Sequence, residues 1–282
     1  MSSPFMTAEW VNLGIITYAV APGLLANRVP DGVELDTQDG QAFVSLVAFS
    51  FHNTRVLGVS WPGYRTFPEL NLRFYVRRAD ERGVVFLREI VGLRLVAWIA
   101  RTFFNENYRV APVSCLTHDA KSHVTMELRL LWAGKTNRIT VTGRKPALVP
   151  AATSAEHRFT ELRCGYGINR RGRTVRYEIE HPAWEIYPVE SHLVDLDWGS
   201  VYGSRWGFLG GQIPHATVLA AGSAVSVYPR VDPPGMVTEE SQLERGILAG
   251  SEPILREPLS EKTVRRRGGL LPELLETSVH GL

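Results

Sequence analysis

Lysine is scarce in this chain. It occurs only at Lys121, Lys135, Lys145 and Lys262, although lysine and arginine together number 31. Arginine keeps its proton at neutral pH and forms no imine with a carbonyl compound, whereas lysine does. The scarcity of lysine therefore leaves few residues that could serve as a Schiff-base nucleophile.

Cysteine and long apolar runs are scarce as well. Cys115 and Cys164 are the only cysteines. They could pair, but two thiols in a chain without a signal peptide favour the reduced state. The N-terminus, MSSPFMTAEW, has no basic region followed by an apolar run, and no stretch approaches the roughly 18 to 20 apolar residues of a membrane span. These absences predict a cytoplasmic protein with no membrane partner.

An excess of charge of either sign is also absent. The 31 basic and 29 acidic residues give a formal net charge of +2, which implies no general attraction to nucleic acid. The RRR run at 265–267 is too short and isolated to suggest such a partner. Phosphate loops, dinucleotide fingerprints and nucleophile elbows are missing. We therefore expect no nucleic-acid partner and no cofactor.

Strand signals dominate the first 230 residues. Short alternating segments are separated by polar turns, and the proline-rich PRVDPP at 229–234 marks a change of composition. We predict one domain over residues 1–230 and a C-terminal tail over residues 231–282 that has little core of its own. The 282 residues are enough for such a large domain with extra ends.

The clearest helix signal covers residues 92–104. This segment is apolar nearly all round, which is typical of a buried helix, and Asn105 and Asn107 are expected to end it. Many strands joined by short turns, with one buried helix, indicate an α+β fold built on an antiparallel barrel or sandwich.

Residues 67–76, FPELNLRFYV, alternate cleanly if they form a strand. One face is apolar and consists of Leu70, Leu72, Phe74 and Val76. The other face carries an acid, an amide, a guanidinium and a phenol: Glu69, Asn71, Arg73 and Tyr75. On an exposed strand this polar face would be a structural ion pair. Inside a cavity it would be a binding site, in which Arg73 could orient a carboxylate or an enolate.

A second group of polar residues, Arg101, Tyr108 and Arg109, lies in and after the predicted helix. Arg101 interrupts an apolar helix and needs an acidic partner such as Glu69 or Glu89 if it is buried; a structural salt bridge is the alternative to a ligand site. Tyr108 and Arg109 alternate, so only one is expected to face inward. Arg109 could hold an anionic group, and Tyr108 could act as an acid.

Two histidine motifs give weaker signals. His118, Asp119 and His123 flank a turn, but no third histidine or cysteine stands at a metal-ligand spacing, so we expect no metal. His181 lies in HPAW, where proline and tryptophan suggest a packing corner.

Four segments together resemble the uncharacterised DUF2071 (YqjF-like) family of the acetoacetate decarboxylase-like superfamily. They are ANRVPDGVELDTQDGQAFVSLVAF (26–49), FPELNLRFYV (67–76), GVVFLREIVGLRLVAWIARTFFNENYRVAPV (83–113) and HRFTELRCGYGINRRGRTVRYEIEHPAW (157–184). The resemblance covers about residues 10 to 230. It implies a mainly antiparallel, closed β-barrel-like domain around an interior cavity, with flanking short helices. The family has no settled activity.

The resemblance also bears on the chemistry. It implies that Glu69 takes an acidic position beside the substrate. Acetoacetate decarboxylase itself uses a lysine Schiff base, and its lysine pair lies on the segment after the barrel helix. Here that segment, NENYRVAP at 105–112, contains no lysine, and Arg109 is its nearest cation. Decarboxylation through an imine is therefore not expected.

Three functions remain open at this point. The first is an enzyme that enolises, hydrates or dehydrates an organic acid or carbonyl compound, and in it Tyr108 or Asn71 could bond a developing oxyanion. Its predicted catalytic residues are Glu69 and Tyr108, and its predicted substrate-binding residues are Asn71, Arg73, Arg101 and Arg109. The second is a non-catalytic binding or sensor protein for a small organic ligand. The third is a scaffold whose tail mediates contacts in a homo-oligomer.

Overall fold

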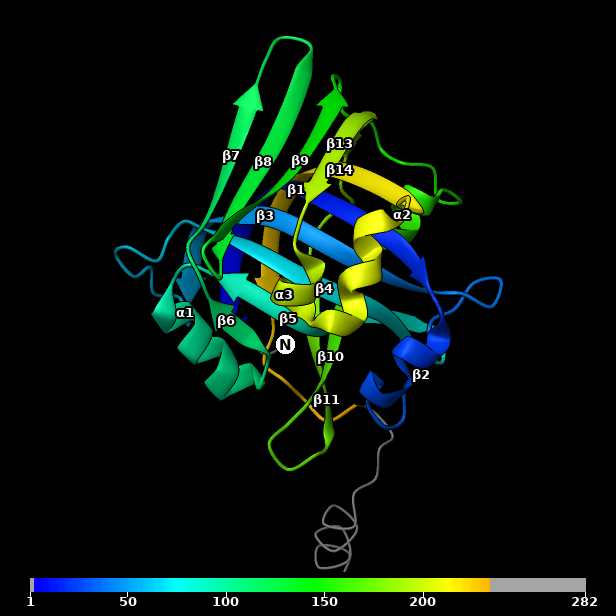
Figure 1. Ribbon diagram of the computed structural model, residues 1–282. Helices are drawn as coiled ribbons and strands as arrows, with labels where there is room; N and C mark the ends of the chain where they lie inside the picture. Colours follow the sequence, from blue (N-terminus) through cyan, green and yellow to red (C-terminus); the bar gives the residue numbers. More distant parts are fainter. Residues whose placement is uncertain (1–2, 234–282) are drawn as a thin grey trace, which may run out of the picture. The chain divides into compact units, whose positions relative to one another are not determined.

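The computed structural model of the chain describes residues 3–233. Almost all of the predicted tail, 231–282, lies outside these residues, so its predicted role in oligomer contacts remains a prediction. The described strands form a ten-stranded sheet and a four-stranded sheet (Figure 1). No helix among the described residues is long and apolar enough to cross a membrane.

The ten-stranded sheet is mainly antiparallel and follows the order β2-β4-β3-β1-β14-β11-β10-β5-β6, with β12 paired to β14. Its strands are β1 (Met6–Val20), β2 (Glu34–Leu35), β3 (Ala42–Val56), β4 (Phe67–Arg78), β5 (Glu81–Val91), β6 (Tyr108–Val110), β10 (Cys164–Ile168), β11 (Thr174–Glu180), β12 (Ile186–Tyr187) and β14 (Ala216–Val227). Strand β4 pairs with β5 as well as with β3, so the sheet curls strongly back on itself.

Two of the strand pairings in this curled sheet are short. Strands β5 and β10 share a single paired position, Val84 with Gly165. Strands β11 and β14 share two. The mostly-sheet α+β class predicted from the sequence is confirmed, and the closed barrel remains a prediction.

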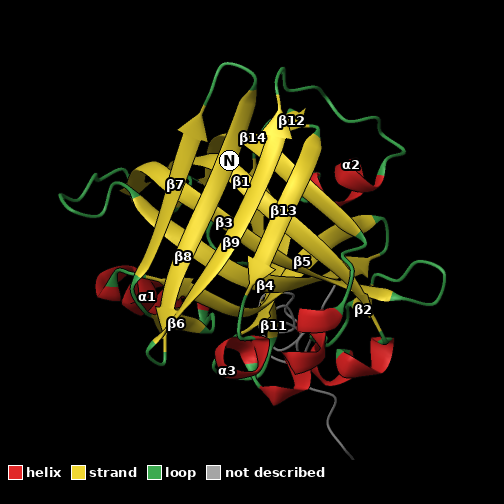
Figure 2. Cartoon of the chain, turned by 45° about the horizontal axis from the view of Figure 1, so that its top comes forward, coloured by secondary structure: helices red, strands yellow, loops and turns green. Residues whose placement is uncertain are grey.

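The four-stranded sheet lies across the large one (Figure 2). It has the order β13-β9-β8-β7 and comprises β7 (Val113–Asp119), β8 (His123–Trp132), β9 (Lys135–Arg144) and β13 (Val189–Asp195). Alternate residues of β8, among them Val124, Met126 and Leu128, are buried. They belong to the same core as Leu70, Leu72 and Phe74 of β4. The apolar face of β4 therefore packs against the small sheet, and its polar face points away from that core.

The helices are few and short. They are α1 (Arg94–Ile99), which continues as a π-helix over Ala100–Phe104, α2 (Ala155–Thr160) and α3 (Trp198–Tyr202), with 3₁₀ turns at Pro22–Leu24, Ala26–Arg28 and Ser204–Gly211. Asn105 takes a left-handed conformation (φ 49°) and ends the π-helix, as the sequence predicted.

The prediction that this helix is buried is wrong. In α1 only Ala97 is fully buried, and Trp98 is 56% exposed. The helix is apolar all round for a different reason, because Leu95, Val96 and Ile99 line a cavity on one side while Ala97 packs into the core on another. Apolar composition alone does not distinguish these two environments.

Candidate functional site

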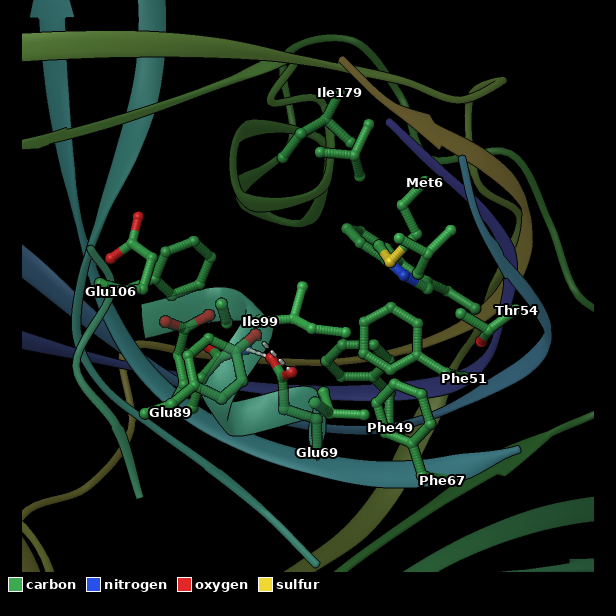
Figure 3. A pocket seen from close by; sticks show the side chains of 18 of the residues that line it. Met6, Phe49, Phe51, Thr54, Phe67, Glu69, Glu89, Ile99, Glu106 and Ile179 are labelled. Carbon is green, nitrogen blue, oxygen red and sulfur yellow. Dashed lines mark hydrogen bonds between the residues drawn. The ribbon is translucent and has the colours of Figure 1, made fainter. Parts of the chain in front are cut away.

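Glu69, Asn71 and Arg73, from the polar face of β4, line a cavity of about 140 Å³ (Figure 3). Most of the wall is apolar and is formed by Trp10, Phe49, Phe51 and Phe67 together with residues of α1. A cavity of about 150 Å³ in another protein is large enough to bind benzene. The space therefore suits a small molecule of about six non-hydrogen atoms.

One end of the cavity is acidic. Glu69 of β4, Glu89 of β5 and Glu106, in the segment between the π-helix and β6, all line it. Glu69 and Glu89 are each only 3% exposed. Figure 3 shows the carboxyl groups of these residues on one side of the space, with Phe51 and Phe67 on the other. The cavity thus has an apolar end and an acidic end.

Glu69 is held by two hydrogen-bond donors. Asn71 Nδ2 donates to Oε1 at 2.9 Å, and the Tyr108 hydroxyl donates to Oε2 at 2.9 Å. Burial raises the pKa of Glu69 to about 7, and these two hydrogen bonds lower it in part. A carboxyl group with a pKa near neutrality is well matched to giving and taking protons at physiological pH.

Glu89 and Glu106 have raised pKa values for the same main reason. Burial, and then the charges of Glu106 and Glu69, hold the pKa of Glu89 well above its ordinary value. Burial raises the pKa of Glu106 to about 8, although the Tyr177 hydroxyl donates to its Oε1 at 3.4 Å. In an apolar cavity three neighbouring carboxylates repel one another and lose their hydration, so protons remain bound there.

The cations predicted for the site are placed differently. Arg73 lines the cavity, but its Nη2 donates to the Phe159 carbonyl at 3.2 Å and its guanidinium lies 5.8 Å from the Tyr75 ring centroid. Arg109 is exposed because Tyr108, its neighbour in β6, takes the inward position. Arg101 is also exposed, and its Nε donates to the Ala97 carbonyl. Arg101 and Arg109 therefore have no place in the cavity, and no lysine is among its lining residues in the described part of the chain.

The two residues that sequence reasoning left out of the site are Glu89 and Glu106. Val85 and Leu87 of β5 face the core between the sheets, so strict alternation would place Glu89 with them. A bulge between the pairs Leu72–Arg88 and Arg73–Phe86 inserts one extra residue in β5 and turns Glu89 toward the cavity. Glu106 follows the left-handed Asn105, in a segment without any periodic pattern.

The histidine motifs lie outside this cavity. His123 Nε2 lies 2.7 Å from Glu190, and Asp119 pairs with Lys145, both at the small sheet. Within residues 3–233, no group of three His, Cys, Asp or Glu side chains is arranged to hold a metal ion. His181 is buried and stacks on Trp184 at 4.3 Å between ring centroids, which is the packing role predicted for HPAW. Cys115 and Cys164 are free thiols.

The raised pKa values predict that the protein loses stability as the pH rises. Glutamates titrate near 4.5 in the unfolded chain, while Glu69 in the folded state titrates near 7. Between these values the folded state binds more protons, so the free energy of unfolding falls with increasing pH. Each pKa unit is worth about 1.4 kcal/mol. We therefore expect urea titrations to give a free energy of unfolding that is lower at pH 8 than at pH 5.5 by at least about 2 kcal/mol.

A pair of matched variants identifies which carboxyl groups cause this pH dependence of the free energy of unfolding. Glu106→Gln should reduce the pH dependence, whereas Glu34→Gln, on the exposed strand β2, should leave it unchanged. Glu81, whose pKa is lowered to about 2 mainly by a hydrogen bond from Arg176, adds stability that is lost only below this window. Equal stability at pH 5.5 and pH 8, or higher stability at pH 8, would contradict the assignment.

Comparisons with known proteins match the chain to a family. Residues 7–224 match the family described as DUF2071, an uncharacterised conserved protein. The uncharacterised protein YqjF of Bacillus subtilis (strain 168) is 38% identical over 104 residues, which span 36% of this chain and 43% of that relative. The alignment thus covers less than half of the relative's length.

Two solved structures share the fold at low sequence identity. Acetoacetate decarboxylase from Legionella pneumophila superposes with a TM-score of 0.54 at 12% identity, over 82% of this chain and 88% of that chain. The enduracididine biosynthesis enzyme MppR, complexed with pyruvate, superposes with a TM-score of 0.52 at 11% identity, over 80% of this chain and 88% of that chain. At these identities the likeness extends to the fold alone.

Proposed function

The chain belongs to the DUF2071 family, and from that premise and the cavity we propose that it binds a small carbonyl compound and transfers a proton at it without a lysine imine. The observation that carries the proposal is Glu69, a buried carboxyl at the acidic end of the cavity whose pKa is raised to about 7. The reaction would be an enolisation. The carboxylate of Glu69 takes a proton from the carbon beside the carbonyl group and later returns one.

Neighbouring side chains fit this role for Glu69. The hydrogen bonds from Asn71 and Tyr108 fix both of its oxygens, so the carboxyl group is oriented before a ligand arrives. In this geometry Asn71 and Tyr108 act on Glu69 rather than on the ligand's oxyanion, so they are positioning residues. The pKa of Tyr108 is held well above its ordinary value by burial and by Glu69 and Glu89, which disfavours its use as a proton donor near neutral pH.

The acidic cavity favours the carbonyl alternative over the organic acid. MppR, a structure with this fold, is complexed with the keto acid pyruvate. In the present chain a ligand carboxylate would meet three glutamates, and the cation that lines the cavity, Arg73, donates to the Phe159 carbonyl. Bringing another negative charge into this site costs both desolvation and repulsion. An uncharged ligand avoids both costs.

Cyclopentanone tests the proposal, because it has six non-hydrogen atoms and exchangeable protons beside its carbonyl. We expect it to raise the melting temperature at millimolar concentration, since so small a ligand binds weakly. In D₂O, NMR should detect enzyme-dependent loss of its α-proton signal. Binding without exchange would instead favour the non-catalytic binding protein.

Borohydride trapping supplies the control for this experiment. Because no lysine lines the cavity among the described residues, we expect intact-mass measurement after reduction to show no adduct of cyclopentanone. A stable adduct on a lysine would replace the proton-transfer mechanism with Schiff-base chemistry.

A further inference from the structure

We propose that Glu89 is the catalytic acid of this site and donates a hydrogen bond from its protonated carboxyl group to the carbonyl oxygen of an uncharged substrate. The inference rests on the proposed function and deepens it, because it names a second catalytic residue and the charge class of the substrate. It rests on the order in which hydrogen-bond donors are distributed among the three glutamates.

The three acidic residues of the cavity receive unequal support. Glu69 accepts two side-chain hydrogen bonds, from Asn71 and Tyr108, and Glu106 accepts one, from Tyr177. Glu89 Oε2 is buried and has no hydrogen-bond partner among the described residues. Hydrogen bonds to a carboxylate favour its charged form. Glu89 has one oxygen without a partner and shares the single Tyr108 hydroxyl with Glu69, which also accepts from Asn71. When the three share protons, Glu89 therefore keeps its proton and Glu69 ionises first.

The position of Glu89 suits a donor to a ligand. Asn71 and Glu89 are directly paired residues of β4 and β5, so Glu89 stands beside the residue that orients Glu69. Asn71 Oδ1 is likewise buried without a partner. Buried polar atoms are rarely left unpaired in folded proteins. Of these two atoms, Glu89 Oε2 carries a donor when it is protonated and can be satisfied by a ligand carbonyl oxygen, whereas Asn71 Oδ1 only accepts and needs a donor that a ketone does not supply.

The residues around Glu89 agree with its protonated state. The titratable groups that act on it or feel its charge are Glu69, Glu106, Tyr108, Tyr177 and Tyr202. None of these is a cation, and Arg73, which also lines the cavity, is directed to the Phe159 carbonyl. A carboxyl group in such surroundings remains neutral at pH 7 and can donate a hydrogen bond, whereas a neighbouring carboxyl with better hydrogen bonding acts as the base.

The proposed step balances between these two groups. The carboxylate of Glu69 takes the α-proton as the C–H bond breaks, and the electron pair moves to the carbonyl oxygen. The Glu89 O–H stabilises the charge that develops there, in a site with mostly apolar walls. In the reverse direction Glu69 returns a proton exchanged with solvent, and the Glu89 hydrogen bond relaxes. The cations near this end act on other groups, Arg73 on the Phe159 carbonyl and Arg230 on the charge of Glu106, so a substrate carboxylate is disfavoured and the proposed substrate class is an uncharged ketone or aldehyde.

Two substitutions at Glu89 distinguish a role in hydrogen-bond donation to the substrate from a role in supporting the fold. Glu89→Gln keeps an N–H donor that does not titrate, and Glu89→Leu removes the donor. We expect Glu89→Leu to lower the rate of cyclopentanone deuterium exchange about 100-fold, the loss typical of an oxyanion donor. Glu89→Gln should keep most of the rate near neutral pH and should lack the fall in rate that wild type shows at high pH, where Glu89 ionises.

A ligand series of constant ring size tests the substrate class. Cyclopentanone should bind at least tenfold more tightly than cyclopentanecarboxylate or the cyclopentylammonium ion. Tighter binding of the ammonium ion that persists in Glu69→Gln and is lost in Glu89→Gln would show that Glu89 is ionised in the complex and would overturn the inference. Wild-type exchange rates in both Glu89 variants would do the same while leaving the proposed function intact. Absence of cyclopentanone exchange in wild type would instead reject the proposed function itself.

Discussion

Glu69→Gln should abolish measurable α-proton exchange of cyclopentanone while the protein remains folded. Removing a general base typically lowers a rate by about 10² to 10⁴, and glutamine cannot accept the proton. Glutamine nearly matches glutamate in shape, so Asn71 and Tyr108 can still contact it. Because Glu69 is neutral in part of the folded population at pH 7, replacing it should not reduce stability at pH 8 and should raise it.

The comparison for this variant is Glu34→Gln, the same chemical change at a residue of β2 whose side chain is 74% exposed. Exchange rates are measured by NMR in D₂O, and melting temperatures of all variants are measured at pH 5.5 and pH 8. If Glu69→Gln retains more than a third of the wild-type rate, Glu69 is not the base. If it is inactive but melts well below wild type at both pH values, the loss reflects structure, and Glu69→Asp becomes the decisive variant.

Strand alternation was a sufficient guide wherever β pairing is regular. The two faces of β4 were separated correctly, since Leu70 and Leu72 lie in the core between the sheets while Glu69 and Asn71 line the cavity. The same rule applied at β6, where Tyr108 faces inward and Arg109 outward. In both strands the side-chain period of two follows from the pleat of the backbone.

Prediction from strand alternation was wrong where the backbone departs from the regular two-residue period of a strand. The bulge in β5 moves Glu89 from the core face to the cavity face. No residue type in the sequence of β5 indicates that a bulge occurs there. The prediction that the helix over residues 92–104 is buried was wrong for another reason. An apolar residue that lines an open cavity, such as Ile99, has the same composition signal as one packed in a core. Both errors concern tertiary geometry, which a local pattern does not contain.

Taken together, these residues give the acidic end a different character from the one the sequence suggested. The alternation of β4 and the residues after the helix predicted a site in which Arg73 and Arg109 bind an anion. In the folded arrangement Arg109 is exposed, Arg73 donates to the Phe159 carbonyl, and Glu89 and Glu106 join Glu69 in the cavity wall, so the acidic end is negative rather than positive. Three carboxyl groups that must share protons form a proton-transfer site more readily than an anion-binding site. The charge of the acidic end is thus set by the bulge that carries Glu89 and the segment that carries Glu106, together with Glu69 of β4.

Gly222→Ala should produce the largest loss of stability among single-atom changes near the cavity. Gly222 of β14 has φ +88°, a conformation that costs an L residue about 1 to 2 kcal/mol. It pairs with Val11 of β1, and a Cβ atom placed on it would fall on the carbonyl oxygen of Trp10. That oxygen belongs to the backbone of a strand held on both sides, so it cannot move without breaking pairing.

We expect Gly222→Ala to lower the free energy of unfolding by about 3 to 5 kcal/mol, the range of severe core substitutions, and the melting temperature by roughly 10 °C. Gly207→Ala is the matched control, because its φ is not positive and its Cβ would meet nothing within 4 Å. Since Trp10 lines the cavity and packs 5.2 Å from Phe49 between ring centroids, displacing its backbone should also weaken cyclopentanone binding. If urea titration gives Gly222→Ala a free energy of unfolding within about 1 kcal/mol of the wild-type value, the prediction is wrong. The backbone of β1 would then be able to shift at Trp10, and the aromatic wall of the cavity would not be rigid.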